Sequence, residues 1–336
     1  MSRPVAGGDM SARLRARWAD QPFMLAPMAG VTDAAYRIMC RRHGARTAYS
    51  EMVSVAGLAF ASEKTWELLL PAPEESDLAV QLFGSRPEQF SSAVAAIQER
   101  LGERLALIDI NMACPARKVI TKGEGSALMD DPERAAAIAA ACVSEAQVPV
   151  TVKMRRSFRA GAETAPELAA RLEAVGVAAV AVHGRTASQL YSGEADWGAI
   201  DRVAERVGVP VIGSGDIFTP EAAARMLAAT AAEAVFVARG SYGNPWIFED
   251  ARAIRAGEAP SEHDWIARLD ALTEHLDLLH ETGAHMRRAR TFAAWYLKGM
   301  PHAAGWRGRA VRCETYRDFI DLVAGIRADV AAATGA

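Results

Sequence analysis

The sequence predicts an α/β protein, a (β/α)₈ TIM barrel followed by a small C-terminal helical bundle. From Pro22 onward, short runs rich in Val, Ile and Leu alternate with longer alanine-rich segments whose apolar residues recur at helical spacing. This alternation is typical of a parallel sheet, and eight such runs in a chain of 336 residues fit a closed barrel. The expected strands are residues 23–27, 47–51, 78–83, 105–110, 149–154, 178–183, 210–214 and 234–239.

The helices expected between these strands begin near a proline, which suits the first helical turn. They are residues 87–101, 132–146, 166–175 and 220–229. The rival architecture, an open doubly wound sheet, would normally carry a G-x-G-x-x-G turn after an early strand. Only a late fragment, residues 213–215, is present, and Phe218 occupies the place of the third glycine. The barrel is therefore favoured.

The chain is expected to divide into three parts: an N-terminal extension (1–20), the barrel (21–258) and the helical bundle (259–336). After about Pro260 the alternation stops, and apolar residues at helical spacing follow in three runs around Trp265, Phe292 and Tyr316. Gly283 ends the first run, as a C-terminal glycine should.

Composition sets limits on the function. The formal net charge is −3, so the overall charge gives no indication of a polyanionic partner. No apolar run is long enough to span a bilayer, and the first stretch lacks the apolar core of a secretory signal, so a cytoplasmic protein with no membrane partner is expected. The 4 cysteines include no C-x-x-C pair and no Cys/His cluster, which predicts free thiols and no metal site. We expect a monomer.

Basic residues gather in the expected bundle, although the chain is acidic overall. A solvated helical surface is the ordinary explanation, and contact with a polyanion is the alternative. The residues are Arg287, Arg288, Arg290, Lys298, Arg307, Arg309, Arg312 and Arg317.

Polar side chains interrupt or end the expected strands. Because the chemistry of a TIM barrel sits at the C-terminal ends of its strands, we expect these side chains to converge on one mouth. The set comprises Met28, Glu51, Gln81, Asn111 with Cys114, Lys153 with Arg155, His183, Ser214 with Asp216, and Arg239.

Glycine-rich turns follow the last two expected strands, at residues 213–216 and 238–240, and a further Gly-Asn-Pro-Trp segment occupies 243–246. Glycines allow backbone amides to approach an anion, and a helix start near Pro245 would add its positive end. Barrels hold phosphates at this place, so the turns predict a phosphate site. Ordinary tight βα turns are the alternative.

Three candidate catalytic residues each leave more than one interpretation open. Lys153 ends an apolar strand, where it could form a Schiff base or supply positive charge to a cofactor. His183 could be a base, a hydrogen-bond donor or a satisfied core histidine. Cys114 stands beside Pro115 in a turn that can face the mouth, although a buried inert cysteine is the usual alternative.

Taken together, several motifs resemble those of tRNA-dihydrouridine synthases, and the bacterial B-type subgroup is the most similar. They occur in the order of that family and run from Phe23 to about Phe248. The motifs are LAPMAGVTD (25–33), VQLFG (80–84), DINMACP (109–115), VKMR (152–155), VHGRT (182–186) and ARG (238–240).

The resemblance implies a flavin-dependent oxidoreductase that binds FMN, takes electrons from NADPH or NADH and reduces the C5–C6 double bond of uridine in tRNA. Cys114 would protonate C5, and the bundle would hold the RNA. The implied flavin ligands are Pro27, Met28, Ala29, Gln81, Lys153 and His183 around the ring, and Ser214, Gly215, Asp216, Ala238 and Arg239 around its phosphate. The implied substrate contacts are Asn111 and Arg155 for the uracil, and Arg287 and Arg290 for the RNA.

Two departures from the family pattern concern the site. Ala113 stands where glycine is usual before the cysteine, and Ser214 stands where asparagine is usual. Neither departure removes the proposed acid or the proposed lysine. They leave open whether the turn keeps the geometry usual in the family and whether the contacts to the flavin phosphate are the same. The alternatives are an FMN barrel acting on a free pyrimidine, which has no need of a basic bundle, a Schiff-base lyase using Lys153, and a catalytically silent barrel.

Overall fold

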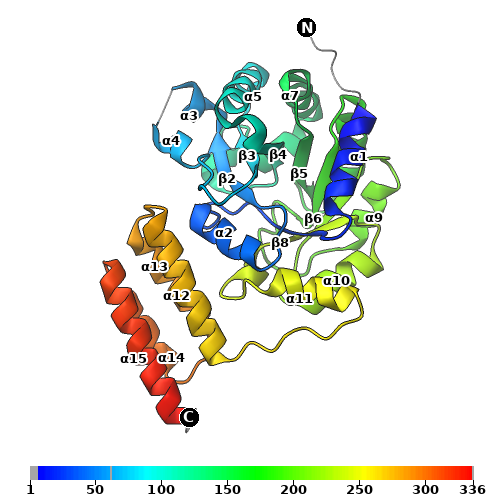
Figure 1. Ribbon diagram of the computed structural model, residues 1–336. Coiled ribbons are helices and arrows are strands. Elements are labelled where there is room, and N and C mark those ends of the chain that lie inside the picture. The colour runs from blue at the N-terminus through cyan, green and yellow to red at the C-terminus, as the bar shows by residue number, and fades with distance from the viewer. Residues whose placement is uncertain (1–6, 61–62, 335–336) are drawn as a thin grey trace.

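The computed structural model describes residues 7–60 and 63–334, and in them eight strands form one closed parallel sheet. The strands follow the order β1-β8-β7-β6-β5-β4-β3-β2. A parallel bridge between Leu25 in β1 and Ala48 just before β2 joins the two edges, which closes the barrel. Figure 1 shows helices around the barrel and a further group of helices beside it. The expected (β/α)₈ barrel is confirmed.

The strands are β1 (Phe23–Leu25), β2 (Tyr49–Ser54), β3 (Leu78–Phe83), β4 (Leu105–Met112), β5 (Val150–Ser157), β6 (Ala179–Thr186), β7 (Val211–Ser214) and β8 (Ala234–Val237). Strands β4 and β5 extend beyond their expected ends, because the ladder continues to pair Asn111 with Lys153 and Arg155 with His183. Asn111 and Arg155 therefore stand within strands and not in the loops after them.

Helices cover the outer face of the barrel. They are α2 (Ala34–Arg42), α3 (Val55–Ala59), α4 (Glu63–Glu67), α5 (Pro87–Leu101), α6 (Arg117–Ile120), α7 (Pro132–Glu145), α8 (Ala165–Ala174), α9 (Gly198–Ala204), α10 (Pro220–Ala229) and α11 (Ile247–Arg255), with 3₁₀ turns η1 (Gly102–Arg104), η2 (Gly125–Asp130) and η3 (Arg239–Ser241). The four helices expected from proline starts are present within one residue of their predicted bounds. Proline at the first turn was thus an accurate signal.

The barrel has two apolar layers, as strands buried on both faces require. Outward residues such as Val80, Ile110 and Val182 pack against the helices. Inward residues such as Met24, Leu107 and Phe236 form a separate inner cluster. The inner cluster fills the barrel toward the N-terminal ends of the strands, and polar side chains occupy the end where the strands have their C-termini.

An N-terminal helix, α1 (Gly7–Trp18), belongs to this inner cluster. The part of the expected extension that lies among the described residues is therefore packed, while residues 1–6 lie outside them. Its Met10, Leu14 and Trp18 are buried against the starts of the strands. Polar side chains of the same helix contact residues that lie shortly before five of the strands: Ser11 with Ala178, Arg15 with Gly208 and Glu233, and Arg17 with Thr47 and Asp77. The helix thus closes the N-terminal end of the barrel.

The C-terminal bundle consists of α12 (Trp265–Glu281), η4 (Met286–Arg288), α13 (Ala289–Tyr296), α14 (Ala303–Ala310) and α15 (Tyr316–Thr334). It packs on the barrel through α12 and α2, and Figure 1 places it at the lower left of the molecule. The three expected runs are helices, whereas α14 was not predicted because its sequence has no clear apolar face. Among the described residues, no helix is long and apolar enough to cross a membrane.

We predict that Trp18→Ala lowers the free energy of unfolding by about 3–5 kcal/mol, because it leaves a large cavity at the closed end of the barrel. Trp18→Phe should cost clearly less, since a ring remains and the indole N–H, which is buried without a hydrogen-bond partner among the described residues, is removed. Urea unfolding followed by circular dichroism measures both. Equal losses for the two variants would contradict the proposed role of the ring.

Candidate active site

A cavity of about 420 Å³ opens at the C-terminal ends of the strands. It brings together all the predicted flavin-binding, uracil-binding and catalytic residues. Each strand except β2 contributes at least one of them, either from the strand itself or from the loop that follows it. These are Pro27, Met28, Ala29, Gln81, Asn111, Cys114, Lys153, Arg155, His183, Ser214, Gly215, Asp216, Ala238 and Arg239. Glu51, expected at the same mouth, lies outside this cavity and pairs with Arg288 of the bundle.

A chain of hydrogen bonds crosses the barrel beneath the cavity. The ladder places Gln81, Asp109 and Thr151 side by side on β3, β4 and β5. The Asp109 carboxylate accepts from Gln81 Nε2 at 2.7 Å and from Thr151 Oγ1 at 2.6 Å. Burial raises the pKa of Asp109 to about 6, although these two hydrogen bonds and the nearby Lys153 oppose the rise. Asp109 was part of a recognised motif, but sequence reasoning gave it no role.

The same chain continues to the Cys114 turn. Asn111 Nδ2 donates to Gln81 Oε1 at 2.7 Å, and Asn111 Oδ1 accepts from the backbone amides of Ala113 and Cys114 at 3.1 and 2.9 Å. On the other side, the amide and hydroxyl of Ser126 donate to the Cys114 carbonyl. The turn that carries the thiol is therefore held from two directions.

The alanine at position 113 fits this turn. Among the described residues, positive φ outside glycine occurs only at Leu190, Asp216 and His302, so the backbone at Ala113 does not require glycine. The Ala113 carbonyl accepts a hydrogen bond from Arg155 Nε at 2.9 Å. The departure from the family pattern at this position thus leaves the turn intact.

Arg155 is buried and holds three backbone carbonyls. Besides Ala113, its Nη1 donates to Thr186 and Leu190, both at 2.8 Å. Burial lowers the pKa of Arg155, but a guanidinium stays charged at neutral pH. Arg155 therefore ties the Cys114 turn to the loop after β6, and only part of its hydrogen-bonding capacity faces the cavity.

Lys153 reaches into the cavity without a hydrogen bond or ion pair to any described residue. Its Nζ lies 5.9 Å from the centre of the Phe236 ring. Burial lowers the pKa of Lys153 to about 8, Arg155 adds to the fall, and Asp109 and Cys114 oppose it. An anionic ligand would favour the charged form and raise this pKa again.

His183 is neutral at physiological pH. Burial is the largest cause, and together with the nearby cations Lys153, Arg155, Arg185 and Arg239 it lowers the pKa of His183 to about 2. Arg185 Nη1 lies 3.5 Å from His183 Nε2, and because a guanidinium only donates, this contact favours the Nδ1–H tautomer. His183 can thus offer one hydrogen-bond donor to a ligand, but no positive charge.

The turn after β7 combines a backbone constraint with an ion pair. Gly215 has φ +123°, and a Cβ there would lie 2.6 Å from Ala195 and 2.8 Å from His183, so only glycine fits. Both oxygens of Asp216 bind Arg185, at 2.7 and 2.9 Å, and the Ala195 amide donates to the same carboxylate. Any contact of Asp216 with a ligand is therefore left to its backbone.

Arg239 packs against two aromatic rings at the rim. Its guanidinium is 4.8 Å from the centre of Tyr191 and 5.0 Å from that of Phe218, and it has no carboxylate partner among the described residues. The rings are about half exposed, at 58% and 49%. Sequence reasoning missed both of them, and no pattern signals them because they stand in βα loops without periodicity.

The charges of the cavity favour an anionic ligand. Arg185 is neutralised by Asp216, whereas Lys153 and Arg239 have no carboxylate partner among the described residues. The Ser214 hydroxyl also has no hydrogen bond to a described residue, and it lies beside the Gly215 backbone. No group of three or more His, Cys, Asp or Glu side chains that could hold a metal occurs in the described part of the chain.

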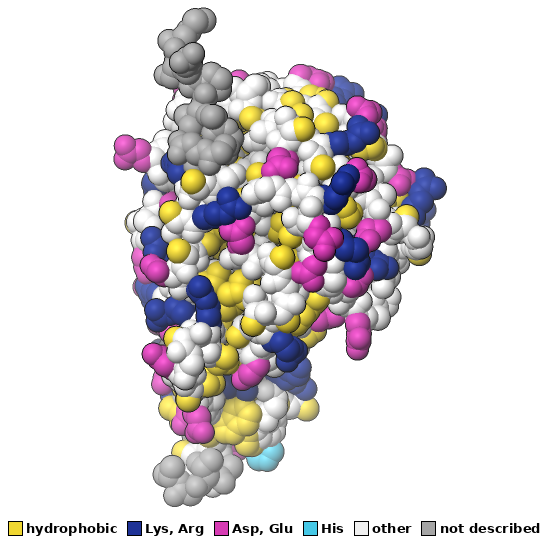
Figure 2. Space-filling view, turned by 90° about the vertical axis from the view of Figure 1, so that its right-hand side faces the viewer, with side chains coloured by type: hydrophobic (Ala, Val, Ile, Leu, Met, Phe, Trp, Pro, Cys, Tyr) yellow, Lys and Arg dark blue, Asp and Glu magenta, His cyan; other side chains and the backbone are white. Residues whose placement is uncertain are grey.

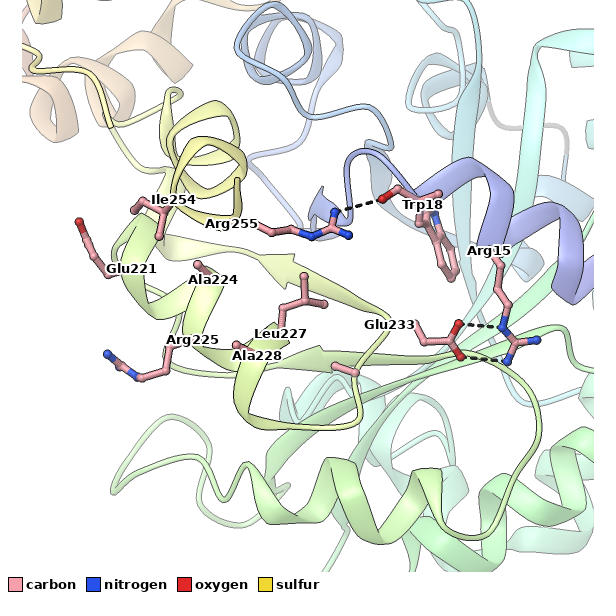
Figure 3. Close-up of a pocket in the computed structure, with 12 residues that line it drawn as sticks. Arg15, Trp18, Glu221, Ala224, Arg225, Leu227, Ala228, Glu233, Ile254 and Arg255 are labelled. Atoms are coloured by element: carbon pink, nitrogen blue, oxygen red, sulfur yellow. Dashed lines mark hydrogen bonds and ion pairs between the residues drawn. The ribbon is translucent and has the colours of Figure 1, made fainter. Parts of the chain in front are cut away.

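A second hollow, of about 880 Å³, lies near the opposite end of the barrel between α1, α10 and α11. Figure 3 shows its apolar floor of Leu227, Ala228 and Ile254 and its two polar contacts, the pair of Arg15 with Glu233 and the bond from Arg255 to the Ala19 carbonyl. None of the predicted site residues lines it. The chemistry is therefore assigned to the cavity at the C-terminal end.

Comparison with known proteins agrees with the motifs. The model of the family "Dihydrouridine synthase (Dus)" matches residues 24–332. The chain is 38% identical over 315 residues to tRNA-dihydrouridine synthase B of Xanthomonas axonopodis pv. citri, covering 90% of this chain and 94% of that protein. It is 37% identical over 309 residues to the protein of the same name from Pseudomonas aeruginosa, covering 88% and 92%.

A solved structure supports the fold alone. Histamine dehydrogenase from Rhizobium sp. 4-9 superposes with a TM-score of 0.51 at 12% identity, covering 76% of this chain and 49% of that one. The extent of the family match and the identity to the curated relatives show the family as well as the fold. On these grounds, and as its motifs indicated, the chain belongs to the dihydrouridine synthase family of oxidoreductases.

Proposed function

We propose that this protein reduces a uracil base in transfer RNA to dihydrouridine, with FMN bound in the barrel cavity, NADPH as the reductant and Cys114 as the proton donor. The observation that carries the proposal is that the Cys114 turn, Lys153 and the glycine-rich turns after β7 and β8 all meet at one cavity. The curated relatives named tRNA-dihydrouridine synthase B, which align with about nine-tenths of the chain, support the same substrate class.

The residues present fit a flavin with a phosphate. The cavity lies within the range of about 300–1,000 Å³ that is usual for cofactor pockets. Pro27, Met28 and Ala29 supply a backbone and apolar wall for a ring system. Lys153 would hold the electron-rich edge of the ring, because a fixed positive charge in a dry site stabilises negative charge.

The phosphate would lie at the turns after β7 and β8. Arg239 offers a guanidinium without a carboxylate partner among the described residues, and Ser214 and Gly215 offer a hydroxyl and a backbone amide. Serine at position 214 keeps a hydrogen-bonding group where asparagine is usual. Asp216 and Ala238 would contribute through the backbone, because the Asp216 carboxylate is engaged by Arg185.

When bound and reduced by NADPH, the flavin supplies the hydride that adds to C6 of the uracil. Cys114 supplies the proton at C5, and its S–H bond breaks as the new C–H bond forms. Lys153 lies close enough to Cys114 for the two groups to interact electrostatically. Asn111 and Arg155 hold the turn so that the thiol faces the cavity.

Asn111 and Arg155 retain some capacity for the uracil. Asn111 uses its oxygen and one N–H within the protein, which leaves one N–H for a carbonyl of the base. Arg155 uses Nε and Nη1, which leaves Nη2. Their primary role is therefore to position Cys114. The base must leave its stack to reach them, which costs a few kcal/mol.

The RNA would be held by a basic cluster on the bundle, defined here as Arg287, Arg290, Arg309 and Arg312 around Cys313. Arg290, Arg309 and Arg312 all lie close enough to oppose the rise in the Cys313 pKa that burial causes. Arg290 Nε also donates to the Cys313 carbonyl, so this side chain partly supports the bundle itself. Glu314 is the acidic partner of Arg287 and Arg290, at 3.8 and 3.4 Å.

The side of the molecule shown in Figure 2 has a different character. Lys and Arg side chains are interspersed there with Asp and Glu, and no large area of one sign is visible. Such a mixture suits a solvated surface and not a polyanion. An enzyme for free pyrimidines would have no use for the basic cluster, so the cluster favours tRNA over that alternative.

The first test is a visible spectrum of the protein purified with FMN. We expect flavin absorbance that bleaches on adding NADPH without air and recovers on adding unmodified tRNA, because the RNA base accepts the electrons. Free uridine serves as the control and should restore little absorbance. Recovery with uridine as fast as with tRNA would favour the free-pyrimidine enzyme, and a protein that binds no FMN would refute the proposal.

Cys114→Ala should bind FMN and be reduced by NADPH as the wild type is, but lose dihydrouridine formation by about 10²–10⁴-fold, the usual contribution of a positioned acid. Mass spectrometry of tRNA nucleosides measures the product. Ala135→Ser, at a buried position in α7 away from the cavity, serves as a control substitution of similar size. Product formation by Cys114→Ala at the wild-type rate would exclude the thiol as the proton donor.

The double variant Arg287→Glu with Arg312→Glu should weaken tRNA binding and lower the slope of log K against log salt by roughly one per lost phosphate contact. Both side chains are exposed, and neither has a hydrogen bond to a backbone carbonyl. Arg171→Glu with Arg206→Glu, on α8 and just after α9, is the matched control. Equal tRNA affinities for the two double variants would show that the basic cluster is an ordinary solvated surface and does not bind the RNA.

A further inference from the structure

One arginine of the bundle joins two carboxylates of the barrel. Arg288, the last residue of η4, donates through Nη1 to Asp33 Oδ2 at 2.8 Å and through Nη2 to Glu51 Oε1 at 2.5 Å. The side chains of Asp33 and Glu51 are only 10% and 9% exposed. The sequence places Arg288 among the basic residues of the bundle surface, for which solvent or a polyanion is the expected neighbour, but its guanidinium faces the barrel.

Each carboxylate uses its second oxygen to hold the loop between β1 and α2. Glu51 Oε2 accepts from the Gly30 amide at 2.5 Å, and Asp33 Oδ1 accepts from the Tyr36 amide at 2.9 Å, where it caps α2. This loop includes Met28 and Ala29, which line the cavity. Arg288 and the loop are therefore linked through the same two side chains.

Arg288 also offsets the cost of burying these two charges. Burial raises the pKa of Asp33, and Arg288 is the first group that opposes the rise. Conversely, burial alone would lower the pKa of Arg288, but Asp33 and Glu51 outweigh it and the pKa is raised. Without the guanidinium, the two carboxylates would be left close together with less compensation, which destabilises the arrangement that holds the loop.

The bundle touches the site at a second place, after β8. Tyr242, which lines the cavity, stacks on Trp295 of α13 with ring centres 3.7 Å apart and planes 4° apart. Gly243 has φ +64°, and a Cβ there would lie 2.5 Å from the Trp295 backbone, so glycine permits this close approach. The bundle thus supports the loops after β1 and β8, and these two strands are neighbours in the barrel.

We propose that Arg288 is a positioning residue for the flavin site: through Glu51 and Asp33 it holds the loop of residues 28–33 in the shape that receives the cofactor. The bundle is then part of the cofactor site as well as an RNA-binding surface. This inference rests on the proposed function for the identity of the ligand, but the contact between Arg288 and the loop does not.

The test compares Arg288→Met with Arg327→Met, which breaks the pair of Arg327 with Asp270 inside the bundle and touches no cavity residue. Without RNA, we expect Arg288→Met to raise the FMN dissociation constant about tenfold and to speed amide hydrogen exchange in residues 28–33, because the loop loses its support. Arg327→Met should match the wild type in both. Arg288→Lys, which keeps the charge but cannot bridge two carboxylates in the same fork, should be intermediate.

A folded Arg288→Met protein with wild-type FMN affinity and wild-type exchange in the loop would overturn the inference. If Arg288→Met does not fold, Glu51→Gln takes its place, because glutamine can still accept from the Gly30 amide but lacks the charge that holds Arg288; unchanged FMN affinity and exchange in that variant would be equally decisive. If the wild type binds no FMN, the proposed function fails, and loop exchange alone decides whether Arg288 supports the loop.

Discussion

A buried chain of hydrogen bonds across three strands sets the geometry of the site. An unpaired polar group at this depth costs about 1–3 kcal/mol, so every member of the chain needs its neighbour. Thr151 and Gln81 satisfy Asp109, Asn111 satisfies Gln81, and the backbone of the Cys114 turn satisfies Asn111. No side chain in it can turn without leaving another unpaired. The thiol at the mouth is thereby fixed relative to a carboxylate at the centre of the barrel.

The arginines around the mouth illustrate how a protein can hold several cations in one region. Arg155 is surrounded by carbonyl oxygens, Arg185 is matched by Asp216, and Arg288 is matched by two carboxylates outside the cavity. These three arginines are engaged by partners within the protein and support the structure around the cavity. Lys153 and Arg239 form no ion pair with a carboxylate of the described residues, although Asp109 and Asp216 lie near enough to interact with them. Both cations therefore remain available to a ligand, which concentrates the capacity for an anion at two points of the cavity.

Much of this architecture could be predicted from the sequence, because strand alternation, proline at helix starts and convergence at the C-terminal ends are local or general rules. Lys153 and Cys114 were found by that reasoning. The partners of Asn111 and Arg155 could not be predicted, since they depend on the register between strands. Arg288 was missed for another reason: an arginine facing solvent and one facing a neighbouring unit have the same sequence pattern. The packing of α1 beneath the barrel likewise depends on tertiary contacts.

The two rings beside Arg239 have a consequence for entropy. A long flexible side chain that must be ordered when a ligand binds loses about 0.5–1.5 kcal/mol of rotamer freedom. The guanidinium already packs against the rings of Tyr191 and Phe218, so part of that loss occurs during folding and not during binding. The rim therefore offers an arginine that is partly ordered before an anion binds, so less of the free energy of that contact is lost in ordering the side chain.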